Sequence, residues 1–308
     1  MKRFHVFISL FFITVFVLTA QEPISTSPKT YTTLEIKPLN APIIDGSLSD
    51  PIWSTVEWAT DFIEVDPDEN TPPSVQTKFK ILYDQKHLYI ALKALDPEPE
   101  TITNRLSRRD GFIGDRINVL IDSYHDLRTG FLFTVTAAGV RGDEFITNNG
   151  DNVDESWNPI WSTKAIIDNE GWSAEMKIPL SQLRFSNSPE QVWGLNVTRN
   201  YFRENQFSAW NRIPVDAAGW VSEAGKLKGL KNIKPQKQIE IQPFVVTKLD
   251  RYEAESGNPY ADGNDFTLNA GLDAKIGITN DLTLDVTINP DFGQVEADPA
   301  AINLDGFE

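Results

Sequence analysis

A stretch of amides, carboxylates and tryptophans between residues 148 and 161 has the side chains that a sugar-binding site needs. It reads NNGDNVDESWNPIW, and it combines hydrogen-bond donors and acceptors with Trp157 and Trp161, whose flat rings can pack against a sugar. A glycine-turned loop whose two tryptophans cap a core would have the same composition. Trp161 leads directly into an expected strand and favours this core interpretation. For Trp157 the sugar-site and core interpretations are equally supported.

An acidic segment at 61–70, DFIEVDPDEN, places Asp66, Asp68 and Asn70 at alternate positions. Alternating oxygen ligands are typical of part of a calcium-binding loop. The glycine and the distal glutamate of an EF-hand are absent, so the pattern favours a solvated acidic loop over a metal site. Calcium is kept as a candidate cofactor on this segment and on the acidity of the whole chain, whose net charge is −16.

Catalysis on glycosidic bonds needs two carboxylates at a set separation across a cleft. Glu175 and Glu204 could form such a pair, and Asp143 stands beside Glu144, but the alternation around Glu175 makes it an ordinary outward-facing strand residue. The sequence has no G-x-S-x-G, HExxH or P-loop motif and no cysteine nucleophile. We expect no catalysis within these residues; any hydrolase activity on glycosidic bonds would reside outside them.

Haem ligation through methionine and histidine is a third class of site. Met176 is the only methionine after Met1, and its strand pattern points it inward. His87 lies in an expected hairpin turn. This arrangement is a poor match to a haem site.

The elements that must position these side chains are predicted to be β-strands. Residues 80–83 and 87–95 flank Asp84-Gln85-Lys86 in a hairpin pattern. Alternation of apolar residues with others recurs in four further segments, 116–121, 131–136, 172–178 and 193–198. Such spacing, broken by Gly, Pro, Asn and Asp, predicts an all-β fold, an antiparallel β-sandwich. A helical turn is expected at 181–185. Trp53 is expected to be a buried anchor that closes a first hairpin, with Trp58 continuing its packing.

The C-terminal stretch differs in character from the rest. All eight tryptophans lie between Trp53 and Trp220, and residues 231–237 form a polar linker. Two alternating strands at 266–278 and 282–288 flank a polar turn, as in the strand pairs of outer-membrane barrels. We therefore expect a flexible leader at 21–34, a sandwich at 35–235 and a second β domain at 236–308. This last segment is a β-hairpin segment that could start a truncated membrane barrel; an extra soluble hairpin fits these residues equally well.

The N-terminal residues indicate export. Lys2 and Arg3 precede an apolar run at 6–18 and the small residue Ala20, which together predict a secretory signal peptide at 1–20. The run is shorter than the ~20 apolar residues that span a membrane, and a retained anchor is the alternative. The net charge of −16 argues against nucleic-acid binding. We expect localisation in the periplasm or outer membrane of a Gram-negative-type bacterium.

Several motifs, in order, resemble family 9 carbohydrate-binding modules. They are IDGSLSDPIW at 44–53, LYD at 82–84 followed by LYIA at 88–91, DRINVLID at 115–122 and GWSAEMKIP at 171–179. The resemblance covers roughly residues 40–230 and implies a DOMON-like sandwich fold. The stretches at 193–196, 225–230 and 289–296 are similar to those of uncharacterised exported bacterial proteins that place such a module before a predicted outer-membrane β-barrel.

The resemblance also implies positions for a sugar site. Sugar-binding members hold the sugar between two aromatic rings and hydrogen-bond its hydroxyls. The first ring corresponds to Phe112, where a tryptophan is expected, and the second to Trp210. Asn118 stands where a glutamate is expected and Thr134 where an arginine is expected, so the family's usual reducing-end specificity is not carried over. Arg116 is a further candidate for hydroxyl contact.

These observations predict non-catalytic carbohydrate binding at the cell envelope, linked to polysaccharide breakdown or uptake. The candidate binding residues are Phe112, Arg116, Asn118, Thr134, Trp157 and Trp210. The expected partners are a glycan and, through a C-terminal barrel, the outer membrane. The alternatives are a structural or interaction module of a barrel protein without a sugar ligand, and part of a glycoside hydrolase.

Overall fold

The computed structural model describes residues 27–237, 239–254, 257, 263–278 and 282–290. Within these ranges the secondary structure consists of β-strands and short 3-10 helices, and the described part of the chain contains no helix that is long and apolar enough to cross a membrane. The predicted signal peptide at 1–20 and the predicted turn at 279–281 lie outside the described residues.

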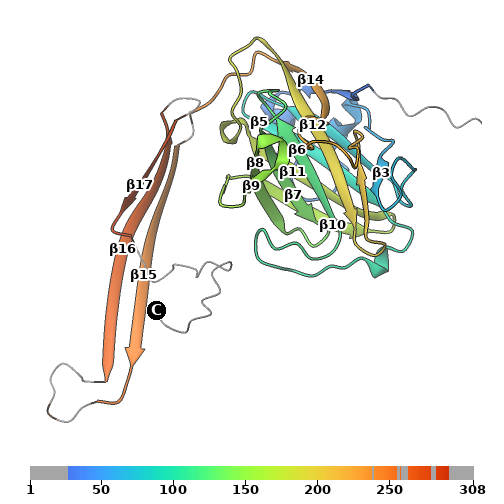
Figure 1. Cartoon of the computed structure of the whole chain (residues 1–308). Helices are drawn as coiled ribbons and strands as arrows, with labels where there is room; N and C mark the ends of the chain where they lie inside the picture. Colours follow the sequence, from blue (N-terminus) through green and yellow to red (C-terminus); the bar gives the residue numbers. More distant parts are fainter. Residues whose placement is uncertain (1–26, 238, 255–256, 258–262, 279–281, 291–308) are drawn as a thin grey trace, which may run out of the picture.

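Two sheets pack face to face and form the sandwich in Figure 1. Sheet A has nine strands: β1 (Thr30–Thr32), β14 (Gly225–Lys231), β12 (Glu190–Tyr201), β6 (Arg116–Asp122), β7 (Gly130–Thr136), β8 (Arg141–Thr147), β9 (Asn152–Asp154), and, beside β12, β13 (Gln206–Ala209) and β3 (Ile63–Asp66). Sheet B has five: β10 (Ser162–Asp168), β11 (Gly171–Pro179), β5 (His87–Leu95), β4 (Thr77–Tyr83) and β2 (Leu34–Glu35). The predicted antiparallel sandwich is confirmed; only β1 with β14 and β2 with β4 run parallel.

The core lies between sheets A and B and follows the period-2 alternation of the strands. On β6, Ile117, Val119 and Ile121 are fully buried, and they belong to the same cluster as Ile90 of β5 and Met176 of β11. Side chains of opposite parity on β6 point away from sheet B. The alternation therefore divides sheet A into a core face and an open face.

The opening segment at 43–58 covers the outer face of sheet B and contains a 3-10 helix, η2 (Pro51–Thr55), instead of the expected hairpin. Trp53 is buried as predicted, and it packs on Leu82 and Tyr89. Its Nε1 donates a hydrogen bond of 2.9 Å to Glu175 Oε1. Trp58 is half-buried, with the Lys80 Nζ at 4.8 Å from its ring centroid. Proline at the first helical position explains why this stretch turns instead of extending.

Four further 3-10 helices connect the strands: η1 (Pro38–Asn40), η3 (Pro99–Thr101), η4 (Asn148–Gly150) and η5 (Leu180–Gln182). The last of these overlaps the start of the helical turn predicted at 181–185, and Leu180 and Gln182 are buried in it.

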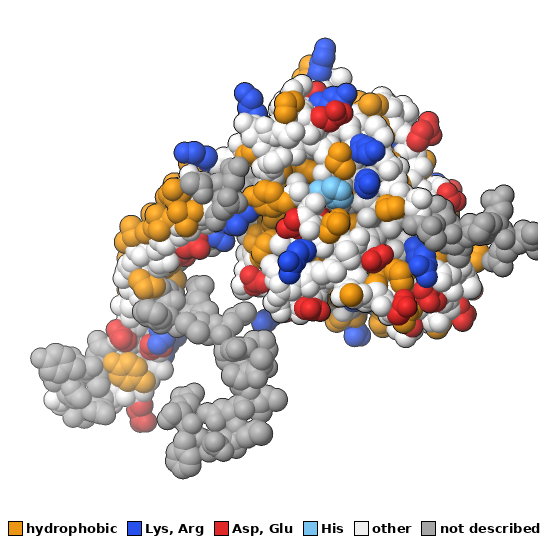
Figure 2. Space-filling model, turned by 45° about the horizontal axis from the view of Figure 1, so that its top comes forward, with side chains coloured by type: hydrophobic (Ala, Val, Ile, Leu, Met, Phe, Trp, Pro, Cys, Tyr) orange, Lys and Arg blue, Asp and Glu red, His pale blue; other side chains and the backbone are white. Residues whose placement is uncertain are grey.

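A third sheet, sheet C, follows the sandwich and stands beside it as a slender lobe (Figure 1). It consists of β15 (Ile239–Arg251), β16 (Asn264–Gly277) and β17 (Thr283–Ile288), all antiparallel. β16 and β17 agree with the two predicted strands, whereas β15 was not predicted. Figure 2 shows hydrophobic side chains gathered along this lobe. Among the residues that the structure describes, sheet C is a single layer with no further sheet packed on it.

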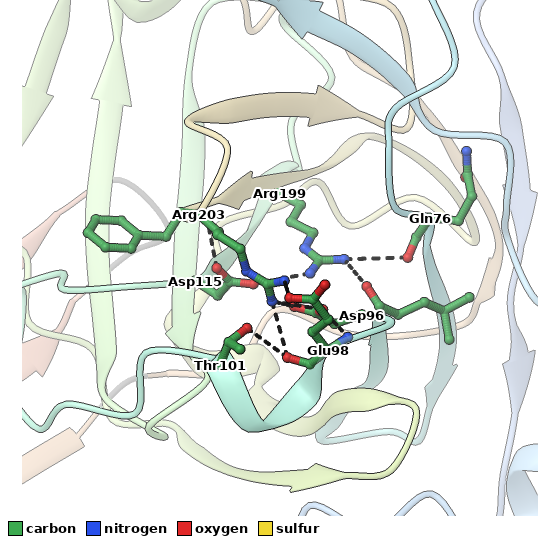
Figure 3. A network of polar contacts seen from close by, with 9 residues as sticks. Gln76, Asp96, Glu98, Thr101, Asp115, Arg199 and Arg203 are labelled. Atoms are coloured by element: carbon green, nitrogen blue, oxygen red, sulfur yellow. Dashed lines mark hydrogen bonds and ion pairs between the residues drawn. The ribbon is translucent and has the colours of Figure 1, made fainter.

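A buried ionic network joins the two sheets of the sandwich near the end of β12 (Figure 3). Arg199 is 0% exposed, and its guanidinium pairs with Asp115 at 3.1 Å and donates to the Leu95 carbonyl at 2.8 Å. Arg203 donates to Asp96 at 2.7 Å. Because Arg199 is on sheet A and Leu95 is on sheet B, the network fixes the position of β12 relative to sheet B.

Candidate functional site

A pocket of about 410 Å³ opens on the open face of sheet A. Its walls come from β6, β7, β8, β12, β13 and the segments around them. The lining side chains are Phe112, Arg116, Asn118, Leu120, Leu132, Thr134, Glu144, Asn196, Thr198, Asn200, Phe207, Ile213 and Trp220.

Strand parity decides which side chains reach this pocket. Arg116, Asn118 and Leu120 occupy the positions of β6 that alternate with its core residues. The register places Asn118 opposite Thr134 of β7 on one side and opposite Thr198 of β12 on the other. Neighbouring strands thus bring residues far apart in sequence into one patch.

Hydrogen bonds among these side chains fix the floor of the pocket. The Asn118 Nδ2 donates to Thr198 Oγ1 at 2.9 Å and to Asn200 Oδ1 at 3.2 Å, while its Oδ1 accepts from Thr134 Oγ1 at 3.0 Å. The Arg116 Nε donates to the same Asn200 oxygen at 3.1 Å. Both amide hydrogens of Asn118 are therefore engaged within the floor, which holds its side chains in one arrangement.

Two charged groups in the pocket keep unused hydrogen-bonding capacity. The terminal amino groups of Arg116 and the carboxylate of Glu144 make no hydrogen bond to any residue that the structure describes. Burial raises the pKa of Glu144, and the charges of Glu155 and Asp110 raise it further, whereas Arg116 lowers it. Burial lowers the pKa of Arg116, and Glu144 opposes that shift. The pocket thus offers a strong donor and a strong acceptor to a ligand.

Two aromatic side chains that line the pocket each pack against a glycine. The Phe112 ring lies over Gly142 of β8, where an added Cβ would overlap it, and the Arg116 guanidinium is 5.4 Å from the ring centroid. In the same way, the Trp220 indole lies over Gly150, where an added Cβ would overlap the ring. A side chain at either glycine would displace its ring, so these two glycines set the positions of the aromatic walls.

Four of the six predicted site residues come together in the pocket: Phe112, Arg116, Asn118 and Thr134. That these four residues bind a sugar stays a prediction. The structure places the other two, Trp210 and Trp157, away from the pocket.

Trp210 was predicted to stack on a sugar, but the structure places it in the core. It is 4% exposed and packs edge-on against Phe79 of sheet B, with ring centroids 5.2 Å apart. Its ring therefore lies between the sheets, on the opposite side of sheet A from the pocket. The aromatic that lines the pocket from this part of the chain is Trp220.

Trp157 also lies on the core side of sheet A. It is half-buried and contacts Phe131 and Phe133 of β7, with centroid distances of 5.0 and 5.5 Å. Those two phenylalanines have core parity, so Trp157 caps the end of the core. Trp161 is 2% exposed in the same cluster, as expected.

Trp220, Glu144 and Asn200 also line the pocket and were not among the predicted site residues. Asn200 shares parity with Thr198 on β12, so extending the predicted alternation beyond 193–198 would have found it. β8 reads RGDEFIT, which lacks clear alternation because Asp143 is buried with core parity.

Two of the carboxylates considered for catalysis, Glu175 and Asp143, have structural partners. Glu175 faces outward from sheet B, as expected, but it is 0% exposed because the segment around Asp45 and Gly46 covers it and donates two backbone hydrogen bonds of 3.0 Å. Burial raises the pKa of Glu175. Asp143 pairs with Arg109 at 2.6 Å. Neither Glu175 nor Asp143 lines the pocket, and Glu204 is exposed on a turn.

The acidic segment considered for calcium binding makes contacts with protein side chains. The Asn70 Oδ1 accepts a hydrogen bond from Arg212, whose guanidinium also pairs with Glu69 at 3.0 Å. A guanidinium at this place disfavours a metal cation by charge repulsion. Across the described ranges no three His, Asp or Glu side chains are gathered to hold a metal.

The two residues considered for haem have separate environments. Met176 is fully buried in the core beside Ile90. His87 lies at the start of β5, with its Nδ1 at 3.4 Å from Asp84.

Two family descriptions match the chain. "Carbohydrate family 9 binding domain-like" matches residues 44–219, and "Domain of unknown function (DUF5916)" matches residues 235–308. No curated protein matches.

Among solved structures, the chain is similar to a family 9 carbohydrate-binding module from Caldicellulosiruptor kristjanssonii in complex with glucose, at 18% identity and a TM-score of 0.47 over 68% of this chain and 97% of that chain. The corresponding complex with cellotriose gives the same identity and TM-score over 68% and 95%. A candidate carbohydrate-binding protein from Bacteroides uniformis is similar at 13% identity and a TM-score of 0.52, over 66% and 99%. At this identity the last likeness bears on the fold alone.

Proposed function

Because the chain belongs to the carbohydrate family 9 binding domain-like family through residues 44–219, we propose that it binds a carbohydrate in the pocket of sheet A. Binding needs no catalytic group in this proposal: the side chains hold the ligand by stacking and hydrogen bonds. The sandwich acts as a non-catalytic module that retains a glycan for uptake or for breakdown by other proteins.

The pairing of aromatic walls with unused polar groups carries this proposal. Phe112 and Trp220 present flat rings on which the C–H face of a pyranose can pack. Arg116 can donate to one sugar hydroxyl and Glu144 can accept from another. Asn118 and Thr134 support these contacts from the floor, since their own hydrogen bonds are made to each other and to β12.

Calorimetric titration of the full chain with sugars and oligosaccharides, preceded by a glycan array, tests the proposal. The Arg116→Ala variant is expected to weaken the binding found for the unmodified chain about tenfold, because a charged hydrogen bond is lost. Arg251→Ala is the matched control, since Arg251 is exposed at the end of β15 in sheet C. Absence of binding to every glycan by a folded chain would favour a structural or interaction module instead.

The second part of the proposal concerns sheet C and the cell envelope. The register of its three strands places exposed apolar side chains on one face: Ile239, Ile241, Val245, Leu249, Phe266, Leu268, Leu284 and Ile288. The opposite face is polar and aligns Glu240, Lys275 and Asp285 across the three strands. A large apolar face that stays exposed among the described residues is typical of an interaction surface.

We propose that lipid hydrocarbon covers this face and that sheet C belongs to an outer-membrane β-barrel. β15 has 13 residues, which corresponds to about 40 Å of strand, enough to cross a hydrocarbon layer of about 30 Å when tilted. Apolar and polar side chains alternate along these strands, as they do in a strand that has lipid on one side and water on the other. An exported protein of this kind would hold its sugar-binding module at the membrane surface.

Flotation of the full chain with vesicles of dioleoylphosphatidylcholine tests this part. Leu268→Lys places a charge on the apolar face and is expected to reduce the vesicle-bound fraction severalfold. Thr267→Lys introduces the same charge one residue earlier, on the polar face, and is expected to leave that fraction unchanged. Equal behaviour of the two variants would contradict contact between this face and lipid.

A further inference from the structure

The pocket has an apolar patch whose own side chains offer a sugar hydroxyl no hydrogen bond. Leu120 of β6 and Leu132 of β7 are opposite each other in the register and both line the pocket. Trp220 and Leu132 pack on the cluster that contains Leu120, Ile146 and Val221. The patch is therefore continuous with one of the two aromatic walls.

This patch lies two residues along each strand from the polar floor. Going along β6, Arg116, Asn118 and Leu120 face the pocket in succession, so the floor changes from charged to neutral polar to apolar within about 13 Å. On the neighbouring β8, Glu144 is opposite Leu132 and lines the pocket beside the patch. A ligand that fills the pocket thus meets polar groups at its sides and two leucines beneath one part.

The leucines restrict what a bound sugar can place on them. A hydroxyl buried there would lose its hydrogen bonds to water and gain none from Leu120 or Leu132, which is unfavourable. A methyl group would instead remove apolar surface from water on both sides of the contact. The surrounding hydroxyls of the same sugar would still reach Arg116 and Glu144.

We propose that the pocket selects a sugar that carries a methyl group, placed on Leu120 and Leu132. This inference rests on the proposed sugar-binding function and adds the chemical class of its ligand. A 6-deoxyhexose and an N-acetylhexosamine both provide such a methyl group, and they are distinguished by separate pairs of ligands in the test.

Titration of the unmodified full chain with matched ligands tests the selection without any mutation. The pairs are L-fucose with L-galactose, L-rhamnose with L-mannose, and N-acetylglucosamine with glucose. In at least one pair the methyl-bearing sugar is expected to bind about tenfold more tightly, as for one apolar group added in an apolar pocket. Tighter binding in one of the first two pairs identifies a deoxyhexose, and tighter binding in the third identifies an acetyl group.

A variant then assigns the selection to the leucines. Leu132→Asn is chosen because Leu132 is half-buried, whereas Leu120 is 2% exposed and its replacement would disturb folding. The variant is expected to lose the preference for the methyl-bearing sugar about tenfold while circular dichroism stays unchanged. Leu39→Asn, at a residue that is 96% exposed, is the matched control and is expected to keep the preference.

The possible outcomes distinguish a failure of the methyl preference from a failure of the proposed sugar binding. Equal or tighter binding of the hydroxylated sugar in all three pairs would overturn the methyl preference and leave sugar binding standing. An unchanged preference in Leu132→Asn would overturn the assignment to the leucine patch. Failure of the folded chain to bind any of these sugars or any glycan on the array would overturn the proposed function, and the inference with it.

Discussion

Arg199 and Arg116 occur on neighbouring strands of sheet A but point to opposite faces, and their surroundings differ completely. Arg199 on β12 is 0% exposed, with Asp115 and two carbonyl groups around its guanidinium. Arg116 on β6 lines the pocket and uses only its Nε within the floor. On the core face, the guanidinium of Arg199 is paired with protein groups. On the open face, the terminal amino groups of Arg116 stay available to a ligand. The comparison predicts that substitutions on the core face change stability and that substitutions on the open face change the proposed sugar binding.

Replacing Trp210 is expected to have the largest effect on stability. Trp210→Ala removes a nearly fully buried indole from the core and is expected to lower the free energy of unfolding by about 3–5 kcal/mol. Chemical denaturation of the full chain measures it, with Trp220→Ala as the comparison. Similar losses for the two tryptophans would break the distinction between the faces.

The ionic network provides the next test. Asp115→Asn leaves Arg199 without its counter-ion in a buried site, and we expect the free energy of unfolding to fall by about 1–3 kcal/mol. The control Asp250→Ala removes the partner of the exposed Lys248 on sheet C, and no change in unfolding is expected. A destabilisation by the control but not by Asp115→Asn would show that burial is not what gives the pair its importance.

The open face should respond in affinity. Trp220→Ala removes an aromatic wall of the pocket and is expected to weaken sugar binding about tenfold. Trp157→Phe changes an aromatic residue on the core side and should leave affinity unchanged. Titration of both variants with the same sugar measures the difference, and a larger loss in Trp157→Phe would place the ligand on the wrong face.

The smallest effect expected is a dependence of affinity on pH through Glu144. Burial and neighbouring carboxylates raise the pKa of Glu144, so it takes up a proton at a higher pH than an ordinary glutamate does on acidification. Protonation replaces a charged acceptor by a neutral one, and affinity should fall about fivefold as the pH drops through this raised pKa. Glu144→Gln should bind weakly and without this dependence. A wild-type affinity that is constant over the same range would argue against a contact between Glu144 and the sugar.

Strand alternation predicted the sandwich, whereas the family resemblance supplied the candidate site residues. Phe112, Arg116, Asn118 and Thr134 lie together in the pocket because Arg116 and Asn118 of β6 and Thr134 of β7 all face the open side of sheet A. Trp210 and Trp220 flank an irregular stretch without periodicity, so no pattern could assign their faces. The family resemblance pointed to Trp210, and packing against Phe79 shows that position to be in the core.

Two other features were beyond local patterns for different reasons. β15 contains Pro243, which argues against a strand, yet β15 lies at the edge of sheet C, where a residue without an N–H is tolerated. Arg199 has core parity on β12, so its burial required a counter-ion. That counter-ion, Asp115, comes from a distant part of the sequence, and only the folded chain shows the pair.

The place of β14 has a mechanical consequence. β14 lies between β1 and β12, and the chain after it leads from Lys231 towards β15. If a captured glycan pulled on the sandwich while sheet C was held, the tension would enter the sandwich at Lys231, the last residue of β14. Because β14 is hydrogen-bonded to β1 on one side and to β12 on the other, two neighbouring strands share the load that it receives.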